Sequence, residues 1–424
     1  MSRFVIHGGR PIAGRLRPPG NKNAVLPMLA AALLTDEPVR LGNIPLIEDV
    51  TTMLEILSAL GVAVDLRGHS LTLCAKGIRR RRLDADLCRC VRSSILLAGP
   101  MAARHGKVTL FPPGGDIIGR RRLDTHFDGL RKLGIRVSGK HEYTFLCSRP
   151  VAADILLEEA SVTATENVVM AACLAQGTTT VFNAACEPHV QDLCRMLVKM
   201  GAAISGIGTN LLTITGRERL GGAAHRVAAD YIDAASFAVA AALTGGRLTV
   251  ADARVHDFQV VEPVFRKLGI KWSADEGELR VPPGQKLRIR NDFGAAIPKV
   301  EDGTWPSFPA DLMSIAIVAA TQARGTMLFF EKLFESRMYF VDRLIDMGAR
   351  IVQCDPHRVI VTGPATMHGT RQSSPDIRAG MALLLAALCA KGESVIENAQ
   401  SIDRGYEAVD KRLRRLGADI VREG

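Results

Sequence analysis

Residues 167–182 read NVVMAACLAQGTTTVF, and this short stretch shows the pattern from which the whole chain is built. Residues 167–175 are apolar on nearly every side and are followed by a glycine, which is typical of a buried helix with a glycine stop. The β-branched run at residues 178–182 predicts a strand. Further along, the spacing predicts a second, amphipathic helix over residues 192–200 and two strands at 202–205 and 211–214. Together these segments predict one α/β unit whose first helix is buried.

The unit recurs along the chain. A Leu-Gly or Met-Gly pair that ends a helical pattern occurs six times, at Leu60-Gly61, Leu133-Gly134, Met200-Gly201, Leu268-Gly269, Met347-Gly348 and Leu416-Gly417. Repeats of about 70 residues indicate units that bury apolar faces against their neighbours. Six such units are too many to share one hydrophobic core, so we expect two domains of three units each. A cleft between the two domains would be the default ligand site. The alternative is one long array, but helices that are apolar all round argue against an open solenoid.

The composition narrows the class of protein. The chain has 424 residues and a net charge of +10, which would suit nucleic acid or small anions, but aromatic residues make up only 5%, so base-stacking surfaces are few. Nine scattered cysteines indicate reduced, mostly buried thiols. The start of the chain has no apolar signal segment, and the longest apolar runs, such as residues 381–390, are too short to span a bilayer. We therefore expect a soluble cytoplasmic protein that binds neither membrane nor nucleic acid.

Residues 112–122, PPGGDIIGRRR, place one carboxylate, Asp116, between glycines and ahead of three arginines. Glycines permit unusual backbone angles and movement, and arginines bind phosphate or carboxylate through two hydrogen bonds. An acid on a mobile loop above an anion site is the outline of a catalytic lid. The alternative is a solvated surface turn.

Three other positions allow both a structural and a functional interpretation. Lys22 stands at a helix entrance, where it is either solvated or holds an anion together with helix N–H groups. Arg92 also begins a helix, where it is either a surface arginine or a contact of a nearby anion, which is favoured because cations suit the other end of a helix. Asp311 is either a helix cap or a general base on a rigid helix end.

Arginines next to acids form three further clusters, at residues 335–337, 376–378 and 402–406. Taken singly they are most simply structural ion pairs. If they converged with Lys22, Arg92 and Arg121, they would form a concentrated cation site. The histidines and cysteines have no metal-ligand spacing, and the chain has no nucleotide-binding glycine loop and no nucleophile elbow.

Ordered motifs across nearly the whole chain match one family. They are Asn21-Lys22-Asn23-Ala24, residues 45–50, Pro113-Gly114-Gly115, Gly119-Arg120-Arg121, Ser161-Val162, Ala164-Thr165-Glu166-Asn167, Phe308-Pro309-Ala310-Asp311, Phe334-Glu335-Ser336-Arg337 and Asp403-Arg404-Gly405-Tyr406-Glu407. On these motifs the chain resembles the UDP-N-acetylglucosamine 1-carboxyvinyltransferases, the enolpyruvyl transferases that begin peptidoglycan and cell-wall synthesis. The resemblance implies two inverse α/β domains, each of three repeated βαβαββ units around buried helices. It places the first domain at residues 22–229, with the lid loop at 112–122, and the second at residues 1–21 plus 230–424.

The resemblance also implies a reaction, in which the enolpyruvyl group of phosphoenolpyruvate moves to the 3′-hydroxyl of UDP-N-acetylglucosamine through a tetrahedral ketal and phosphate is released. Phosphoenolpyruvate concentrates negative charge, so it needs a cage of cations. The matching phosphoenolpyruvate positions are Lys22, Asn23, Arg121, Arg337, Arg378 and Arg404. The matching nucleotide-sugar positions are Arg92, Arg121, Arg122, Leu123, Asp124, Thr125, Ser161, Val162, Asp311 and Leu333. Asp311 is implied as the general base, Lys22 and Arg404 as catalytic cations, and no metal or organic cofactor is expected.

The chain departs from the family pattern at Asp116, where most members have cysteine. The resemblance leaves two roles open for Asp116: it donates a proton to C3 of phosphoenolpyruvate, which requires a raised pKa in the closed site, or it acts in product release. It cannot form the thioether by which fosfomycin inactivates the cysteine enzymes, so we expect insensitivity to fosfomycin.

The usual Lys-x-Ser-Val-Gly reads Glu159-Ala160-Ser161-Val162-Thr163, which leaves a different nucleotide or nucleotide-sugar acceptor as the alternative. A catalytically silent anion-binding regulator is the other alternative, although Lys22, Asp311 and Arg404 are all present. We expect a monomer or weak homo-oligomer.

Overall fold

The computed structural model describes residues 2–116 and 118–424. They form two compact units. The inserted unit contains residues 20–116 and 121–228, and the terminal unit contains both chain ends, in residues 2–19, 118–120 and 229–424. No helix in the described part of the chain is long and apolar enough to cross a membrane.

The inserted unit packs its helices among short strands. Its helices are α1 (Lys22–Ala31), α2 (Glu48–Leu60), α3 (Ala85–Cys90), α4 (Ala98–His105), α5 (Asp124–Lys132), α6 (Val162–Ala172) and α7 (Pro188–Lys199), with short 3-10 turns η1 (Ala32–Leu34), η2 (Ala75–Gly77) and η3 (Arg92–Leu97). Its strands are β3 (Val39–Gly42), β4 (Ala63–Arg67), β5 (Ser70–Cys74), β6 (Lys107–Leu110), β7 (Arg136–Ser138), β8 (Tyr143–Leu146), β9 (Asp154–Leu156), β10 (Thr178–Phe182), β11 (Ala203–Ser205), β12 (Leu211–Thr215) and β13 (Ala223–Arg226). Within the described residues they form three sheets, ordered β13-β3-β5-β4, β6-β8-β7 and β11-β12-β10-β9.

The terminal unit repeats this plan. Its helices are α8 (Tyr231–Leu243), α9 (Glu262–Lys267), α10 (Met313–Gln322), α11 (Val341–Asp346), α12 (Ile377–Cys389), α13 (Gln400–Asp403) and α14 (Val409–Arg415), with 3-10 turns η4 (Val255–Phe258), η5 (Phe293–Ala295), η6 (Ala310–Leu312) and η7 (Arg337–Phe340). Its strands are β1 (Arg3–His7), β2 (Gly14–Leu16), β14 (Leu248–Val250), β15 (Ser273–Asp275), β16 (Glu278–Val281), β17 (Lys299–Glu301), β18 (Gly325–Phe330), β19 (Arg350–Gln353), β20 (Arg358–Gly363), β21 (Arg371–Ser373), β22 (Glu393–Glu397) and β23 (Asp419–Glu423). The described residues give three sheets here too, ordered β21-β22-β1-β23, β15-β16-β14-β2 and β17-β18-β20-β19.

The six sheets share one hydrogen-bonding pattern, which confirms the predicted repeat. Five of them contain one parallel pair and two antiparallel pairs, and the parallel pairs are β3 with β13, β9 with β10, β2 with β14, β17 with β18, and β21 with β22. In the sixth, β6 pairs antiparallel with β8 and makes its parallel contact through a bridge from Thr109 to Arg82. A parallel pair requires a crossover connection, and one α-helix provides it in three of the sheets: α6 between β9 and β10, α10 between β17 and β18, and α12 between β21 and β22.

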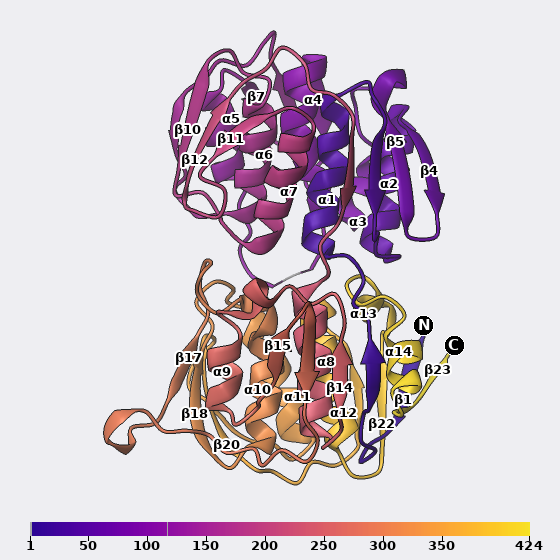
Figure 1. The fold of residues 1–424 in the computed structure, drawn as a ribbon, viewed down its shortest axis with the longest axis vertical. Coiled ribbons are helices and arrows are strands. Elements are labelled where there is room, and N and C mark those ends of the chain that lie inside the picture. The colour runs from indigo at the N-terminus through magenta and orange to yellow at the C-terminus, as the bar shows by residue number, and fades with distance from the viewer. Residues whose placement is uncertain (1, 117) are drawn as a thin grey trace. The chain divides into compact units, whose positions relative to one another are not determined.

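The predicted buried helices lie at the centre of each unit. In the terminal unit α8, α10 and α12 pack on one another between the sheets (Figure 1). Nearly every residue of α8 and α12 is buried, which is why these helices have no polar face. The predicted helix at 167–175 is found as α6, which starts earlier, at Val162, and ends at Ala172.

The six predicted Leu-Gly and Met-Gly pairs each follow a surface helix. Their glycines all have a left-handed backbone, with φ between 81° and 103°. A side chain is disfavoured in that conformation, so glycine ends the helix and turns the chain into the next strand.

Candidate functional site

Asp311 of the terminal unit accepts hydrogen bonds from two arginines. Its Oδ1 lies 2.7 Å from Nη2 of Arg337, and its Oδ2 lies 2.8 Å from Nη2 of Arg378. The three residues come from two neighbouring repeats: Asp311 at η6 and Arg337 at η7 belong to one, and Arg378 in the first turn of α12 belongs to the next. Asp311 is therefore not the helix cap that its position in the sequence allows, because Pro309 stands at the N-cap of η6 and makes no side-chain cap bond.

This group of three charges is largely shielded from water. The arginine side chains are 11% and 8% exposed, and the Asp311 side chain is 23% exposed. Burial by itself raises the pKa of Asp311, but the guanidinium groups of Arg378 and Arg337 outweigh it and hold that pKa well below its ordinary value. Asp311 is thus a carboxylate, and in this arrangement it is a weak base.

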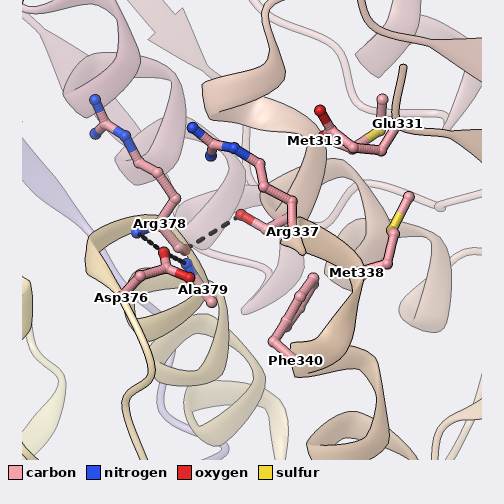
Figure 2. Close-up of a pocket in the computed structure, with 9 residues that line it drawn as sticks. Met313, Glu331, Arg337, Met338, Phe340, Asp376, Arg378 and Ala379 are labelled. Atoms are coloured by element: carbon pink, nitrogen blue, oxygen red, sulfur yellow. Dashed lines mark hydrogen bonds between the residues drawn. The ribbon is translucent and has the colours of Figure 1, made fainter. Parts of the chain in front are cut away.

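A small cavity of about 10 Å³ adjoins the two arginines, near the lower limit for one water molecule (Figure 2). Glu331 lines it and is fully buried. Burial and the neighbouring Asp302 carboxyl raise the pKa of Glu331 to about 9, so the group is a neutral acid at pH 7. Asp376, also on the cavity, accepts hydrogen bonds from the backbone N–H groups of Arg378 and Ala379 and caps α12.

Glu335 and Asp403 do not pair with the arginines that follow them in the sequence. Glu335 accepts a hydrogen bond from the backbone N–H of Arg120 at 3.1 Å, although it stands two residues before Arg337. Asp403 pairs with Arg422 at 2.6 Å rather than with Arg404, which follows α13. Leu333, a predicted sugar contact, is 40% exposed.

In the inserted unit, Lys22 begins α1 and is held by Asp49 of α2. Its Nζ lies 2.6 Å from Oδ2 of Asp49, and the two side chains are 12% and 6% exposed. The side chain of Asn21 caps α1 by accepting the N–H of Ala24, so the capping interpretation applies to Asn21 and leaves Lys22 as a fixed, buried cation. Asn23 follows in the first turn of α1 and is partly buried.

Arg92 and Arg121 lie close together in the same unit. The guanidinium of Arg92 donates a hydrogen bond to the backbone carbonyl of Arg121. Burial and the charge of Arg121 lower the pKa of Arg92 to about 10. A bound anion would relieve this repulsion, so the pair has the electrostatics of an anion site.

The charged residues just before α5 point to a different role for Arg122. Its Nε lies 2.6 Å from Oδ2 of Asp124, both side chains are exposed, and the carboxylates of Glu158 and Glu159 lie nearby. Glu159 thus offsets the charge of Arg122 on the surface. Leu123 packs against the core and Thr125 is buried.

The hydroxyl of Thr163, which stands where the family usually has glycine, is hydrogen-bonded inside the inserted unit. Its hydroxyl lies 3.0 Å from Nε2 of His126, and Nδ1 of His126 lies 3.1 Å from the side-chain amide nitrogen of Asn167. Because that amide nitrogen can only donate, His126 accepts at Nδ1 and donates from Nε2 to Thr163. Burial and the charge of Arg92 lower the pKa of His126 to about 3, which keeps it neutral. Ser161 caps α6 by accepting the N–H of Ala164, and Val162 begins that helix.

The predicted lid loop is described except for Ile117, which lies outside the described residues. Residues up to Asp116 belong to the inserted unit, where Gly114 is required because a Cβ there would lie 1.6 Å from the carbonyl oxygen of Arg89. Residues 118–120 belong to the terminal unit and bind its segment 335–336 through hydrogen bonds. The loop therefore has contacts of its own and is not a solvated turn.

The structure brings together Asp311, Arg337 and Arg378 in one unit and Arg92 with Arg121 in the other. Two neighbouring groups were not singled out by the sequence: Asp49, which pairs with Lys22, and Glu331, which lines the cavity beside the two arginines. Asp49 does lie in a segment that matches the family, but its importance depends on a partner that the sequence does not reveal.

Comparisons with known proteins agree with this fold. The sequence model of the family EPSP synthase (3-phosphoshikimate 1-carboxyvinyltransferase) matches residues 6–413. Two solved structures share the fold over nearly their whole length: the enolpyruvyl transferase NikO from Streptomyces tendae (TM-score 0.88, 24% identity, 99% of this chain and 98% of that one) and EPSP synthase from Acinetobacter baumannii (TM-score 0.77, 18% identity, 100% of both). The architecture is that of the enolpyruvyl transferases.

Sequence similarity is higher to one branch of these enzymes. The chain is 51% identical to UDP-N-acetylglucosamine 1-carboxyvinyltransferase of Treponema denticola over 99% of both chains, and 45% identical to that of Bacteroides thetaiotaomicron over 100% of both. It therefore belongs to the EPSP synthase family of transferases, in the branch of the UDP-N-acetylglucosamine 1-carboxyvinyltransferases.

Proposed function

We propose that this protein transfers the enolpyruvyl group of phosphoenolpyruvate to the 3′-hydroxyl of UDP-N-acetylglucosamine and releases phosphate, as the first committed step of peptidoglycan synthesis in the cytoplasm. The observation that carries the proposal is the convergence of Arg337 and Arg378 on the carboxylate of Asp311. Two guanidinium groups directed at one carboxylate form a site for a carboxylate ligand, and phosphoenolpyruvate brings one.

We also propose, from the same contacts, how Asp311 works as a base. While both arginines bind Asp311, it holds a proton poorly. When the carboxylate of phosphoenolpyruvate takes over the guanidinium groups, their charge is neutralised and the pKa of Asp311 rises. The base becomes effective only when the second substrate is bound, which limits unproductive chemistry.

Proton transfers in the proposed reaction balance. Asp311 takes the proton of the attacking hydroxyl as its oxygen bonds to C2 of phosphoenolpyruvate, and Asp116 gives a proton to C3. In the second half C3 returns a proton to Asp116, the bond from C2 to the phosphate oxygen breaks, and phosphate leaves with the proton held by Asp311. Lys22, Arg121 and Arg404 are the proposed phosphate-binding cations, and Arg92 is a proposed contact of the nucleotide diphosphate.

The acceptor is proposed to be UDP-N-acetylglucosamine, as in the names of the relatives. The hydroxyl of Thr163 is hydrogen-bonded to His126, and the exposed carboxylate of Glu159 lies near Arg122. Neither of these two departures from the family pattern therefore adds an unpaired group that would favour a different nucleotide-sugar acceptor. Activity is tested by measuring phosphate release from phosphoenolpyruvate with either UDP-N-acetylglucosamine or its 3-deoxy analogue as the acceptor. The analogue lacks the hydroxyl that attacks phosphoenolpyruvate. We expect release with the first only; release with neither, or equally with both, would refute the proposal.

A further inference from the structure

The guanidinium of Arg378 lies in surroundings that do not favour a cation, so contacts with neighbouring side chains have to hold it in place. Arg378 stands in the first turn of α12, where the helix dipole disfavours a cation, and its side chain is only 8% exposed. Asp311 neutralises the outer side of the guanidinium at 2.8 Å. If Asp311 is displaced during turnover, another contact has to keep the guanidinium in the same orientation.

Tyr406 provides that contact on the buried side. It is fully buried, and the guanidinium carbon of Arg378 lies 5.4 Å from the centre of its ring, within the range of a cation–π interaction. Tyr406 therefore contacts Arg378 through the face of its ring.

The hydroxyl of Tyr406 is held by Ser236. The Ser236 hydroxyl lies 2.8 Å from the carbonyl oxygen of Ile232, to which it donates its one proton, and 3.1 Å from the Tyr406 hydroxyl. Tyr406 must therefore be the donor to Ser236. This bond anchors the ring of Tyr406, over which the guanidinium of Arg378 lies.

A residue that only filled the core would not need this hydroxyl, since phenylalanine occupies nearly the same space. We propose that Tyr406 is a positioning residue that holds Arg378 in the orientation needed to bind the carboxylate of phosphoenolpyruvate. This inference rests on the proposed function of Arg378. Tyr406 itself touches no substrate in the proposal and acts only through Arg378.

The test uses the whole enzyme and the variant Tyr406→Phe, with Tyr339→Phe as the control because Tyr339 is 60% exposed. Tyr406→Phe removes the hydrogen bond to Ser236 that anchors the ring over Arg378, and it should raise KM for phosphoenolpyruvate by roughly threefold to tenfold. KM for the acceptor should change less than about twofold, because Arg378 binds only the carboxylate in this proposal. The control should match the wild type.

A double-mutant cycle separates positioning from general loosening. In an Arg378→Lys background, Tyr406→Phe should add almost nothing to KM for phosphoenolpyruvate, because the oriented guanidinium is already gone. An unchanged KM in Tyr406→Phe, an equal rise in both KM values, or the same effect in both backgrounds would each overturn the inference.

Two further outcomes are distinguishable. If Tyr406→Phe does not fold, Ser236→Ala removes the acceptor of the phenol proton and should raise the same KM by a smaller factor; no rise would count against the inference. A wild type that consumes no phosphoenolpyruvate, or an Arg378→Lys variant with an unchanged KM, would overturn the proposed function itself, and the inference with it.

Discussion

Replacing Asp311 with asparagine removes one negative charge from between two buried guanidinium groups. Each of the two hydrogen bonds to Asp311 is charge-assisted and contributes about 1.5 to 3 kcal/mol. Because the Asp311 side chain is 23% exposed, water reduces the loss, and we expect the free energy of unfolding to fall by about 3 kcal/mol. The turnover number should fall by about 10² to 10⁴ because the general base is lost.

The same variant should bind phosphoenolpyruvate more tightly, by about tenfold or more, which corresponds to about 1.4 kcal/mol. The reason is competition: in the wild type the substrate carboxylate must displace Asp311 from Arg337 and Arg378, and in Asp311→Asn it need not. A simple loss of structure in the site would weaken binding instead.

Titration calorimetry with phosphoenolpyruvate measures the affinity, and urea unfolding measures the stability. Asp342→Asn is a matched control, because Asp342 is an exposed carboxylate on α11 of the same unit. Weaker or equal binding by a folded Asp311→Asn variant would refute the competition, and near-normal turnover would remove Asp311 from the mechanism.

Three further outcomes are expected. Because the pKa of Glu331 is raised to about 9 from 4.5, the stability that its protonated form contributes is complete below about pH 4.5 and is lost as pH rises through 9. Between these values the free energy of unfolding of the wild type should fall, relative to that of Glu331→Gln, by up to about 1.4 kcal/mol per pH unit. If the urea midpoints of the two proteins changed equally between pH 5 and pH 8.5, this prediction would be contradicted. Fosfomycin should leave the wild type active and unmodified but should inactivate Asp116→Cys with a covalent adduct, so an adduct on the wild type in the mass spectrum would show the prediction to be wrong. Thr163→Val should lower the free energy of unfolding by about 1 kcal/mol, because His126 loses its acceptor, while KM for UDP-N-acetylglucosamine stays unchanged; a large rise in that KM would mean that Thr163 contacts the acceptor.

The sequence was most predictive where local pattern and tertiary structure depend on the same residues. The six glycines after the surface helices, such as Gly61 and Gly417, are needed for a left-handed turn, and the apolar helices are needed for a buried centre. Both constraints leave a mark on every repeat, so the number of units and their α/β character were predictable.

The site was less predictable because its contacts join residues that lie far apart in the sequence. Residues 311, 337 and 378 were identified singly, but nothing in the sequence indicates that Asp311 occupies the two arginines that are proposed to bind substrate. Tyr406 depends in the same way on Ser236, 170 residues away. Neighbours in the sequence, such as Glu335 and Arg337, were in contrast poor guides to ion pairs.

The most direct measurement is the identity of the product. Incubation of the purified wild type with phosphoenolpyruvate and UDP-N-acetylglucosamine, followed by mass spectrometry and NMR, should give the 3-O-enolpyruvyl ether of the nucleotide sugar with one phosphate released per ether formed. An unchanged nucleotide sugar, or an ether formed only with a different acceptor, would contradict the proposed reaction.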